Sequence, residues 1–412
     1  MSGPDALLIV GLNYAPEEVG IGPFTQGLAE GLAARGHAAR VIAGQPYYPQ
    51  WKRYPGFGPG WTRAEENGVT ITRCPHYVPA QPSGIKRIIH LASFALSALA
   101  PALSAARAKP KVVICIAPAL LSVAIAWIAA RLAGASLWIH VQDFEVEAAL
   151  ATGLVSDGAA ARAARWLENR LLGLADRVST ISPQMCAKLA EKGVCASRVV
   201  ELRNWANAPA LEPARGYSYR SEWGLGQRRV ALYSGNVANK QGIEIIIEAA
   251  QLLAGREDLV FVVCGEGPNR ARLQEQAAGL SNVQFHDLQP AARLGELLTL
   301  ADVHLLPQIA GAADLVLPSK LANMLWSARP VVATAVAGTG LYDEVQGCGL
   351  ATAPGDAAAF AEAIARLLDD PEEAAALGAV GARRAAERWA RDAIVDRASA
   401  AIALLTQAAR SS

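Results

Sequence analysis

The chain has 412 residues, of which 52% are hydrophobic and 18% are charged, and its formal net charge at pH 7 is +1. This length favours two domains of roughly 200 residues, and the scattered, balanced charges argue against a nucleic-acid-binding protein. The six cysteines form no C-x-x-C pair, and no histidine lies at metal-ligand spacing. This pattern favours a reducing cytoplasm and argues against a zinc site or a disulfide framework. Residues 1–5 lack the basic start and the cleavage site of a signal peptide.

The first half of the chain alternates expected strands and helices. Short buried runs of β-branched residues predict strands, and residues 22–35, which end in Gly36-His37, predict a helix after the first of them. The expected strands cover residues 7–11, 39–44, 67–73, 111–117, 136–141 and 177–181. Such alternation is typical of a doubly wound parallel sheet.

Residues 46–82 are rich in proline, glycine and aromatic side chains and read as an ordered loop around the short third strand. Loops on such scaffolds often carry recognition. Aromatic rings pack against the faces of sugars, but packing against the protein itself explains them equally well.

Two apolar stretches raise the question of a membrane. Residues 112–134 contain no acid and one base, Arg131, but Pro118 divides them, so we expect a buried strand and a buried helix rather than a spanning helix. Lys86-Arg87 precedes an apolar helix at residues 88–100. A helix of this kind can lie in a membrane interface or face the protein core, and the sequence leaves both open.

The strand–helix pattern restarts after a linker at residues 204–220. Expected strands at 229–234, 259–264, 283–285, 303–306 and 331–333 alternate with helices at 242–253, 269–278 and 291–301, and with a helix that begins near Pro318. Two alanine-rich helices follow at 357–368 and 371–387. The sequence therefore predicts an N-terminal domain of residues 1–208, a C-terminal domain of residues 209–390, and a last helix at 391–412 that could return to the N-terminal domain.

Candidate site residues follow the expected strands, because open parallel sheets bind ligands beyond the carboxyl ends of their strands. After the first strand, Gly20 and Gly22 could let the backbone approach a phosphate or a sugar, although a tight turn explains them as well. Asp143 follows the fifth strand in a cluster of acids and is our candidate for acid–base or hydroxyl-orienting work. His140 points away from that edge and is expected to be structural.

Two loops of the second half have the same character. Gly235 and Asn236 stand before Lys240 and Gln241, so that glycine, a base and a helix N-terminus coincide. The turn at 265–268, Gly-Glu-Gly-Pro, follows the next strand, and its backbone could border a nucleotide base. Each loop could also be a simple turn between strand and helix, but both lie at one edge of one domain.

Residues 316–334 contain the most informative helix. Pro318 suits a first helical turn, and Ser319 and Asn323 lie four residues apart on one face, with Lys320 beside them. A helix N-terminus presents backbone N–H groups and partial positive charge, so an anion could bind at Ser319 and Lys320. The alternative is a surface helix with an ordinary lysine.

These motifs together resemble those of the family-4 glycosyltransferases, which are retaining enzymes with two Rossmann-like domains, the GT-B fold. The resemblance covers nearly the whole chain. It is carried by the glycine-rich first loop, the segment 234–242, the turn 265–268, Ala301-Asp302-Val303, and Pro318-Ser-Lys…Pro330-Val-Val. The variants at 235–236, 240–242, 204–205 and 318–320 resemble the branch of colanic acid fucosyltransferases and related exopolysaccharide enzymes.

The resemblance implies that the C-terminal domain binds a nucleotide-diphosphate sugar and the N-terminal domain binds the acceptor. Lys240 and Lys320, with Asp143, would be the catalytic residues, and the two lysines would stabilise the leaving diphosphate without a metal or a cofactor. The donor-binding candidates are Gly20, Gly22, Gly235, Asn236, Gln241, Gly265, Glu266, Gly267, Pro318, Ser319, Leu321 and Asn323.

The sequence departs from the family at several of these positions. Two glutamates eight residues apart are usual, but Leu315 and Asn323 stand there, and Asn323 could bond a ribose hydroxyl only without charge assistance. A usual arginine, lysine and histidine correspond to Asn236, Gln241 and Gln142.

We therefore expect a retaining hexosyltransferase that uses a GDP- or UDP-sugar and a lipid-linked oligosaccharide acceptor in exopolysaccharide or cell-surface glycan biosynthesis. No nucleic acid is expected as a partner, and any membrane contact would run through residues 86–106 of a cytoplasmic, peripheral protein. Two alternatives remain. A nucleotide-sugar 2-epimerase would need no acceptor, and a non-catalytic nucleotide-sugar-binding assembly protein would explain the missing glutamates.

Overall fold

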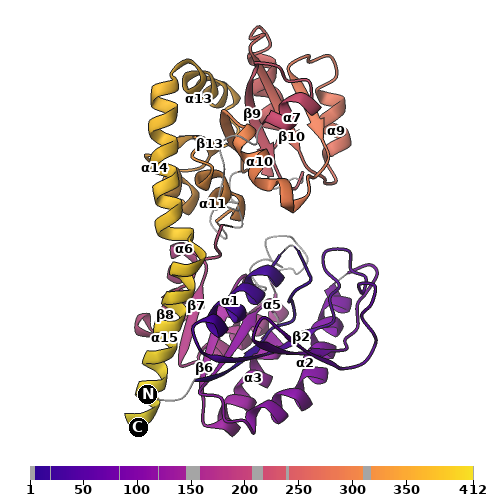
Figure 1. The fold of residues 1–412 in the computed structure, drawn as a ribbon, viewed down its shortest axis with the longest axis vertical. Helices are drawn as coiled ribbons and strands as arrows, with labels where there is room; N and C mark the ends of the chain where they lie inside the picture. Colours follow the sequence, from indigo (N-terminus) through magenta and orange to yellow (C-terminus); the bar gives the residue numbers. More distant parts are fainter. Residues whose placement is uncertain are drawn as a thin grey trace. The chain divides into compact units, whose positions relative to one another are not determined.

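The computed structural model describes residues 5–18, 20–82, 84–118, 120–144, 158–206, 217–237, 241–309 and 317–411. The chain forms two compact units: unit 1 is Met1–Arg203 with Asp392–Ser412, and unit 2 is Asn204–Arg391. Each unit is an α/β domain built around its own sheet (Figure 1). The borders fall close to the expected ones at residues 208 and 390, and the last helix belongs to unit 1.

Unit 1 holds an eight-stranded sheet with the order β3-β4-β2-β1-β5-β6-β7-β8. The strands are β1 (Ala6–Val10), β2 (Ala38–Gly44), β3 (Thr62–Glu66), β4 (Val69–Cys74), β5 (Val112–Ala117), β6 (Ser136–Val141), β7 (Arg177–Thr180) and β8 (Val199–Glu201). The helices are α1 (Gly22–Ala34), α2 (Gly84–Ala106), α3 (Leu120–Ala133), α5 (Ala159–Leu172), α6 (Pro183–Glu191) and α15 (Arg391–Ser411). The strand order reverses at β1, which lies between β2 and β5, and this is where open parallel sheets bind ligands.

Unit 2 holds a six-stranded parallel sheet with the order β11-β10-β9-β12-β13-β14, which reverses at β9. The strands are β9 (Arg229–Ser234), β10 (Leu259–Cys264), β11 (Val283–His286), β12 (Val303–Leu306), β13 (Val331–Thr334) and β14 (Gly349–Thr352). The helices are α7 (Tyr217–Glu222), α8 (Glu244–Leu252), α9 (Arg270–Gln276), α10 (Leu294–Leu300), α11 (Ser319–Trp326), α12 (Gly340–Val345), α13 (Ala357–Asp369) and α14 (Pro371–Trp389).

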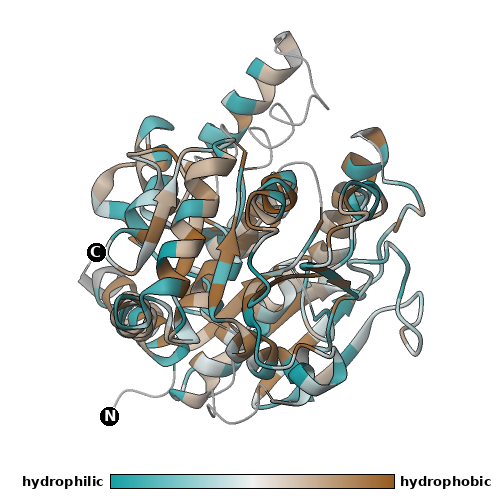
Figure 2. Ribbon diagram, turned by 90° about the horizontal axis from the view of Figure 1, so that it is seen from above, coloured by the Kyte–Doolittle hydropathy of each residue, from teal (hydrophilic) through white to brown (hydrophobic). Residues whose placement is uncertain are grey.

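The central strands are continuous apolar runs. All six residues of β5 and all six of β10 are buried, as expected for parallel strands with helices on both faces. In unit 2, α8 and α13 pack on one face of the sheet, and α7 and α10 pack on the other. The strands are accordingly brown in Figure 2, while the helices carry hydrophilic stretches on their outer faces.

The edge strand β3 corrects the sequence interpretation, which placed residues 62–66 in a loop and began the next strand at Asn67. β3 pairs antiparallel with β4, and Asn67 and Gly68 form the turn with φ angles of 49° and 78°. Asn-Gly is the preferred pair for a two-residue hairpin turn. All five residues of β3 are exposed, so hydrophobicity gives no sign of this strand.

The last helix, α15, packs on α1 within unit 1. The Arg35 Nε donates to Asp396 Oδ1 at 2.5 Å. Gly31 of α1 lies so close that a Cβ there would come within 2.9 Å of the buried Val395 side chain. The chain therefore crosses back after α14 and completes the N-terminal domain.

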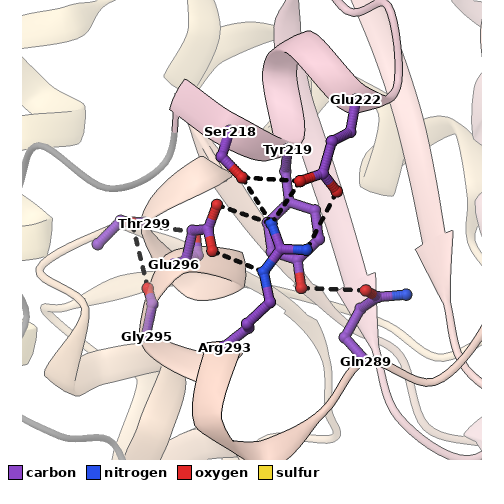
Figure 3. A network of polar contacts seen from close by, with 8 residues as sticks. All are labelled: Ser218, Tyr219, Glu222, Gln289, Arg293, Gly295, Glu296 and Thr299. Atoms are coloured by element: carbon purple, nitrogen blue, oxygen red, sulfur yellow. Dashed lines mark hydrogen bonds and ion pairs between the residues drawn. The ribbon is translucent and has the colours of Figure 1, made fainter.

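A polar network fastens α7 to α10 at the start of unit 2 (Figure 3). The Arg293 guanidinium lies 3.8 Å from the ring centroid of Tyr219, and it donates to the carboxylates of Glu222 and Glu296 at 2.9 and 2.8 Å. The Tyr219 hydroxyl donates to Gln289 at 3.0 Å. These contacts fix the first described helix after the linker to α10 and to the residues just before it.

The two apolar stretches have different structures. Residues 112–134 form β5 and α3, as expected, and not one long helix. Among the described residues, α2 is long enough and apolar enough to cross a membrane by length and composition alone. However, one face of α2 is buried in the core of unit 1, where it contacts α3 and the sheet.

Candidate functional site

The loops after β9 and β10 touch at the carboxyl edge of the unit 2 sheet. Gly235 N donates to Cys264 O at 2.9 Å, and Val237 N donates to Glu266 O at 2.8 Å. Gly265 and Gly267 have φ angles of 153° and 157°, and a Cβ at either would overlap the backbone carbonyl of the other loop. Glycine is therefore needed at both positions because two backbones meet there.

Lys320 lies against this pair of loops. Its Nζ donates to the Tyr233 hydroxyl at 2.8 Å and stands 4.2 Å from the centroid of that ring. A Cβ on Gly235 would come within 2.7 Å of the same Nζ. The structure thus brings together Gly235 and Lys320, two of the expected site residues, although 85 residues separate them in the sequence.

Tyr233 is the penultimate residue of β9 and is fully buried. Its hydroxyl accepts from Lys320 and donates to Asn236 O at 2.6 Å. Burial raises the pKa of this phenol, so Tyr233 is neutral at physiological pH. It therefore orients the Lys320 ammonium without contributing a charge that would cancel it.

Lys320 is also in the first turn of α11. Pro318 is the N-cap residue of the helix and makes no side-chain capping hydrogen bond. Ser319 is exposed and Asn323, one turn later, is half-buried. Leu321 is buried in the hydrophobic core, so only its backbone could reach a ligand. The Lys320 ammonium and the positive end of the α11 dipole therefore lie at the same place. An anion could bind there.

Two amide oxygens lie beside this region. Gly242, next to Gln241, is so close to the loop after β12 that a Cβ there would meet Ile309 at 3.0 Å. The buried Oε1 atoms of Gln241 and Gln308 have no hydrogen-bond partner among the described residues. The Gln308 backbone is held by Thr334, whose hydroxyl donates to Gln308 O at 2.7 Å. Buried acceptors of this kind are rare in folded proteins, and sugar hydroxyls could satisfy them.

The carboxyl edge of the unit 1 sheet is organised by Glu17. This residue is 2% exposed, and its Oε1 accepts from the backbone N–H groups of Tyr47 and Tyr48 at 2.9 and 3.0 Å. Burial raises the pKa of Glu17 against the lowering effect of these hydrogen bonds. A Cβ on Gly22 would meet the Glu17 side chain at 3.0 Å, and one on Gly20 would meet the Tyr48 ring at 3.0 Å. The two glycines thus let the loop after β1 close on the loop after β2.

The residues at the end of β6 and directly after it differ in role. His140 accepts or donates at Ser179 Oγ over 2.8 Å and contacts Gln142 Nε2 over 2.9 Å. Complete burial lowers the pKa of His140 to about 4, so it is a neutral structural residue. Gln142 is buried with it, whereas Asp143 is exposed. Asp143 thus remains the residue of this segment that a ligand could reach.

The other candidates are placed less directly. Glu266 is exposed and pairs with Arg270 of α9, so it stands at the rim of its loop. Lys240, Leu315 and residues 145–147, which belong to the acid cluster that begins at Asp143, lie outside the described residues. Sequence reasoning missed Tyr233, Glu17 and Gln308. Of these, Tyr233 alone had a local signal, as a tyrosine near the end of a buried strand, two residues before Gly235.

Comparisons with known proteins bear on this geometry. A family model described as "Glycosyl transferase 4-like domain" matches residues 19–205, and one described as "Glycosyl transferases group 1" matches residues 228–370. The "putative colanic acid biosynthesis glycosyl transferase WcaI" of Escherichia coli K12 is 42% identical over 344 residues, which cover 81% of this chain and 84% of that protein. The chain belongs to the group 1 glycosyltransferases.

Solved structures agree with the fold of this glycosyltransferase. Sucrose-phosphate synthase of Thermosynechococcus elongatus is 20% identical with a TM-score of 0.76, and the alignment covers 98% of this chain and 100% of that one. HepE of Anabaena, solved in complex with UDP, is 14% identical with a TM-score of 0.69 over 97% and 99% of the two chains. The prediction of a GT-B fold is confirmed.

Proposed function

We propose that this glycosyltransferase moves a hexose, with retention, from a GDP- or UDP-sugar to a lipid-linked oligosaccharide in the assembly of an exopolysaccharide or another cell-surface glycan. The observation that carries the proposal is the position of Lys320, whose ammonium lies at the first turn of α11, on Tyr233 and against Gly235. The relatives support the pathway, because WcaI of Escherichia coli is described as a colanic acid biosynthesis enzyme.

Lys320 would act on the leaving group. As the bond between the sugar and the diphosphate breaks, negative charge accumulates on the departing phosphate oxygens. A preorganised ammonium and the N-terminus of α11 stabilise that charge in the transition state more than in the bound donor. Lys240 would add a second positive charge. We propose that these groups do this work without a metal ion.

The rest of the unit 2 edge would hold the donor. The turn of Gly265, Glu266 and Gly267 would border the base, and Asn236 would stand beside the diphosphate. Asn323 would bond the ribose hydroxyls, since its amide can both donate and accept. The amide oxygens of Gln241 and Gln308, which lack partners among the described residues, would accept from hydroxyls of the transferred sugar.

Unit 1 would supply the acceptor side. Gly20 and Gly22 keep the loop after β1 closed, and Asp143 is exposed at the end of β6. We propose that the Asp143 carboxylate orients a hydroxyl of the donor or the acceptor for attack. The acceptor oxygen would attack from the face that the leaving diphosphate departs from, so the anomeric configuration is kept.

The experiment is an incubation of the purified enzyme with a panel of GDP- and UDP-hexoses and with lipid-linked oligosaccharides from a bacterial membrane extract. The readouts are release of nucleoside diphosphate and the anomeric coupling constant of the glycan product by NMR, with and without EDTA. Transfer with the donor's anomeric configuration, unchanged by EDTA, is expected.

Two outcomes would replace the proposal. Release of nucleoside diphosphate with free epimerised sugar, independent of acceptor, would indicate a nucleotide-sugar 2-epimerase. Donor binding without release, in every acceptor mixture, would indicate a non-catalytic binding protein, which is the alternative that Asn323 in place of a glutamate raises. A product with the opposite anomeric configuration to the donor would refute retention but not glycosyl transfer itself.

A further inference from the structure

About one third of unit 1, residues 67–142, carries positively charged side chains and no negatively charged ones. Residues 67–142 contain no aspartate or glutamate and seven lysines and arginines, although the whole chain has a formal net charge of +1. Six of the seven bases are exposed, and the buried one is Arg73. The exposed bases are Lys86, Arg87, Arg107, Lys109, Lys111 and Arg131. Both ends of α2 are therefore basic, since Lys86 and Arg87 lie in its first turn and Arg107 and Lys109 follow its last residue.

α2 has two apolar faces. The first is buried in the core of unit 1 and includes His90, Phe94, Ala98 and Ala102. The second consists of large side chains that the protein leaves exposed. Their exposed fractions are 74% for Ile85, 63% for Ile88, 49% for Ile89 and 73% for Leu96. Ile88 and Ile89 follow Ile85 by three and four positions, and Leu96 lies two turns beyond Ile89, so the four side chains form a single stripe along the helix.

Two aromatic residues border α2 beside this stripe. The Trp61 Nε1 donates to Ser97 O at 3.1 Å, and the Tyr77 backbone N–H donates to Ser93 Oγ at 2.9 Å. Trp61 is 60% exposed and Tyr77 is 43% exposed. Trp and Tyr rings with one apolar body and one polar group are enriched at membrane–water interfaces.

We propose that the exposed stripe of α2, with Trp61 and Tyr77, docks onto the surface of an anionic lipid bilayer. A basic helix with an apolar face binds such a surface by partial insertion and by attraction to anionic headgroups. The helix lies in the interface and does not cross it, because its other face is part of the unit 1 core. The exposed isoleucines, the flanking aromatic rings and the bases at both ends of α2 together match the interface of an anionic bilayer, whereas a protein partner would need acidic residues opposite the same bases.

This inference extends the proposed function, because a lipid-linked acceptor is present at that surface, but it stands on charge and exposure in unit 1. It can therefore fail while donor binding in unit 2 holds. Conversely, the enzyme could bind vesicles and show no transfer, which would leave the surface intact and refute the proposed reaction.

The experiment is sedimentation of the full chain with phosphatidylcholine vesicles that contain either no anionic lipid or about one third phosphatidylglycerol. Binding to the anionic vesicles is expected, with weak binding to the neutral ones and a loss of affinity in high salt. Ile85→Ser/Ile88→Ser/Ile89→Ser should lower the partition coefficient at least tenfold. Lys86→Gln/Arg87→Gln should lower it by about fivefold for each charge and flatten the salt dependence.

Leu252→Ser/Leu288→Ser is the matched control. These leucines are 60% and 61% exposed and belong to unit 2, so their loss should not change vesicle binding. Thermal unfolding and the response to nucleotide sugars should be the same in all variants, since every substituted side chain is exposed.

Equal vesicle binding by the triple isoleucine variant and the wild type would overturn the proposal. Absence of wild-type binding to anionic vesicles would also overturn it. The wild type could instead fail to bind vesicles and form a dimer in analytical ultracentrifugation that the isoleucine variant does not form. This result would show that the stripe is an interface between copies of the chain.

Discussion

The carboxyl edges of the two sheets are held together in different ways. In unit 2, the described residues of the loops after β9 and β10 touch through their backbones, at Gly235, Gly265 and Gly267. In unit 1, a side chain joins the loops after β1 and β2, because the buried Glu17 carboxylate accepts from the N–H groups of Tyr47 and Tyr48.

The difference decides what each edge offers a ligand. In unit 2, the space beside the loops is occupied by the Lys320 ammonium at a helix N-terminus, so that edge attracts anions. In unit 1, Tyr47 is surrounded by His76 and His90, with ring centroids 5.3 and 4.7 Å away. Burial lowers the pKa of both histidines, that of His76 to about 4, so the cluster is neutral. A diphosphate suits unit 2, and an uncharged sugar suits unit 1.

The largest expected effect tests the backbone contact in unit 2. Gly265→Ala should destabilise the protein by at least about 4 kcal/mol or prevent folding, because its Cβ would overlap Gly235 O and one backbone would have to move. The measurement is urea unfolding followed by circular dichroism. Gly279→Ala is the control, since Gly279 also has a positive φ, 90°, but has nothing within 4 Å, and should cost only about 1 kcal/mol. Equal costs would show that the loops do not need this contact.

The next largest effect distinguishes the catalytic role of the Lys320 charge from a role in stability. Lys320→Ala should reduce kcat by about 10²- to 10³-fold, as expected for the loss of a group that stabilises transition-state charge, with little change in Tm. The measurement is initial-rate kinetics with the donor found in the panel. Lys188→Ala, at a half-buried lysine that pairs with Glu191 in unit 1, should leave kcat unchanged. Near-normal turnover by Lys320→Ala would remove the anion site from unit 2.

Glu17 provides the corresponding test in unit 1. Glu17→Ala should cost about 2 to 3 kcal/mol of stability, because two backbone N–H groups would be left without their acceptor. The measurement is again urea unfolding. A change below about 0.5 kcal/mol would mean that the loops after β1 and β2 are held by packing instead.

The pH dependence refines this test. Burial raises the pKa of folded Glu17 above its unfolded value, so its protonated form is favoured by folding. Its contribution to stability is complete below the unfolded pKa and is lost as the pH rises through the folded pKa. Glu17→Gln should remove this dependence, and the stability difference between variant and wild type should move in favour of the variant as the pH rises from the unfolded pKa of Glu17 through its higher folded pKa. Parallel stability curves for the two proteins would contradict the assignment.

The smallest effect concerns Asn323 in unit 2. Asn323→Glu should fold normally and tighten donor binding by about threefold to tenfold, because a carboxylate makes stronger hydrogen bonds to ribose hydroxyls. The measurement is calorimetric titration with the nucleotide sugar. A loss of donor binding would show that α11 meets the donor in another orientation.

Much of this architecture could be predicted from local pattern. The runs that form β5 and β10 are buried on both faces, so hydrophobicity alone marks them, and their ends differ from expectation by at most one residue. β3 could not be found in this way, because all of its residues face solvent and only the Asn67-Gly68 turn signals it.

The site was predictable in part for a similar reason. Lys320 could be found because a proline, a serine and a lysine mark the first turn of a helix in a single stretch. Its contact with Tyr233 spans 87 residues, and the contact of Glu17 with Tyr47 spans 30. Such contacts arise from the strand order of the folded sheet, and no periodicity in the chain encodes them.

The central claim is that unit 2 binds a nucleotide-diphosphate sugar through Lys320. The most direct measurement is a thermal-shift panel of nucleoside diphosphates and their sugars on the wild type and on Lys320→Ala, because a ligand that binds only the folded state raises its Tm. One nucleoside diphosphate and its sugar should raise the Tm of the wild type clearly and that of Lys320→Ala little or not at all. No shift with any compound, or equal shifts in both proteins, would contradict the claim.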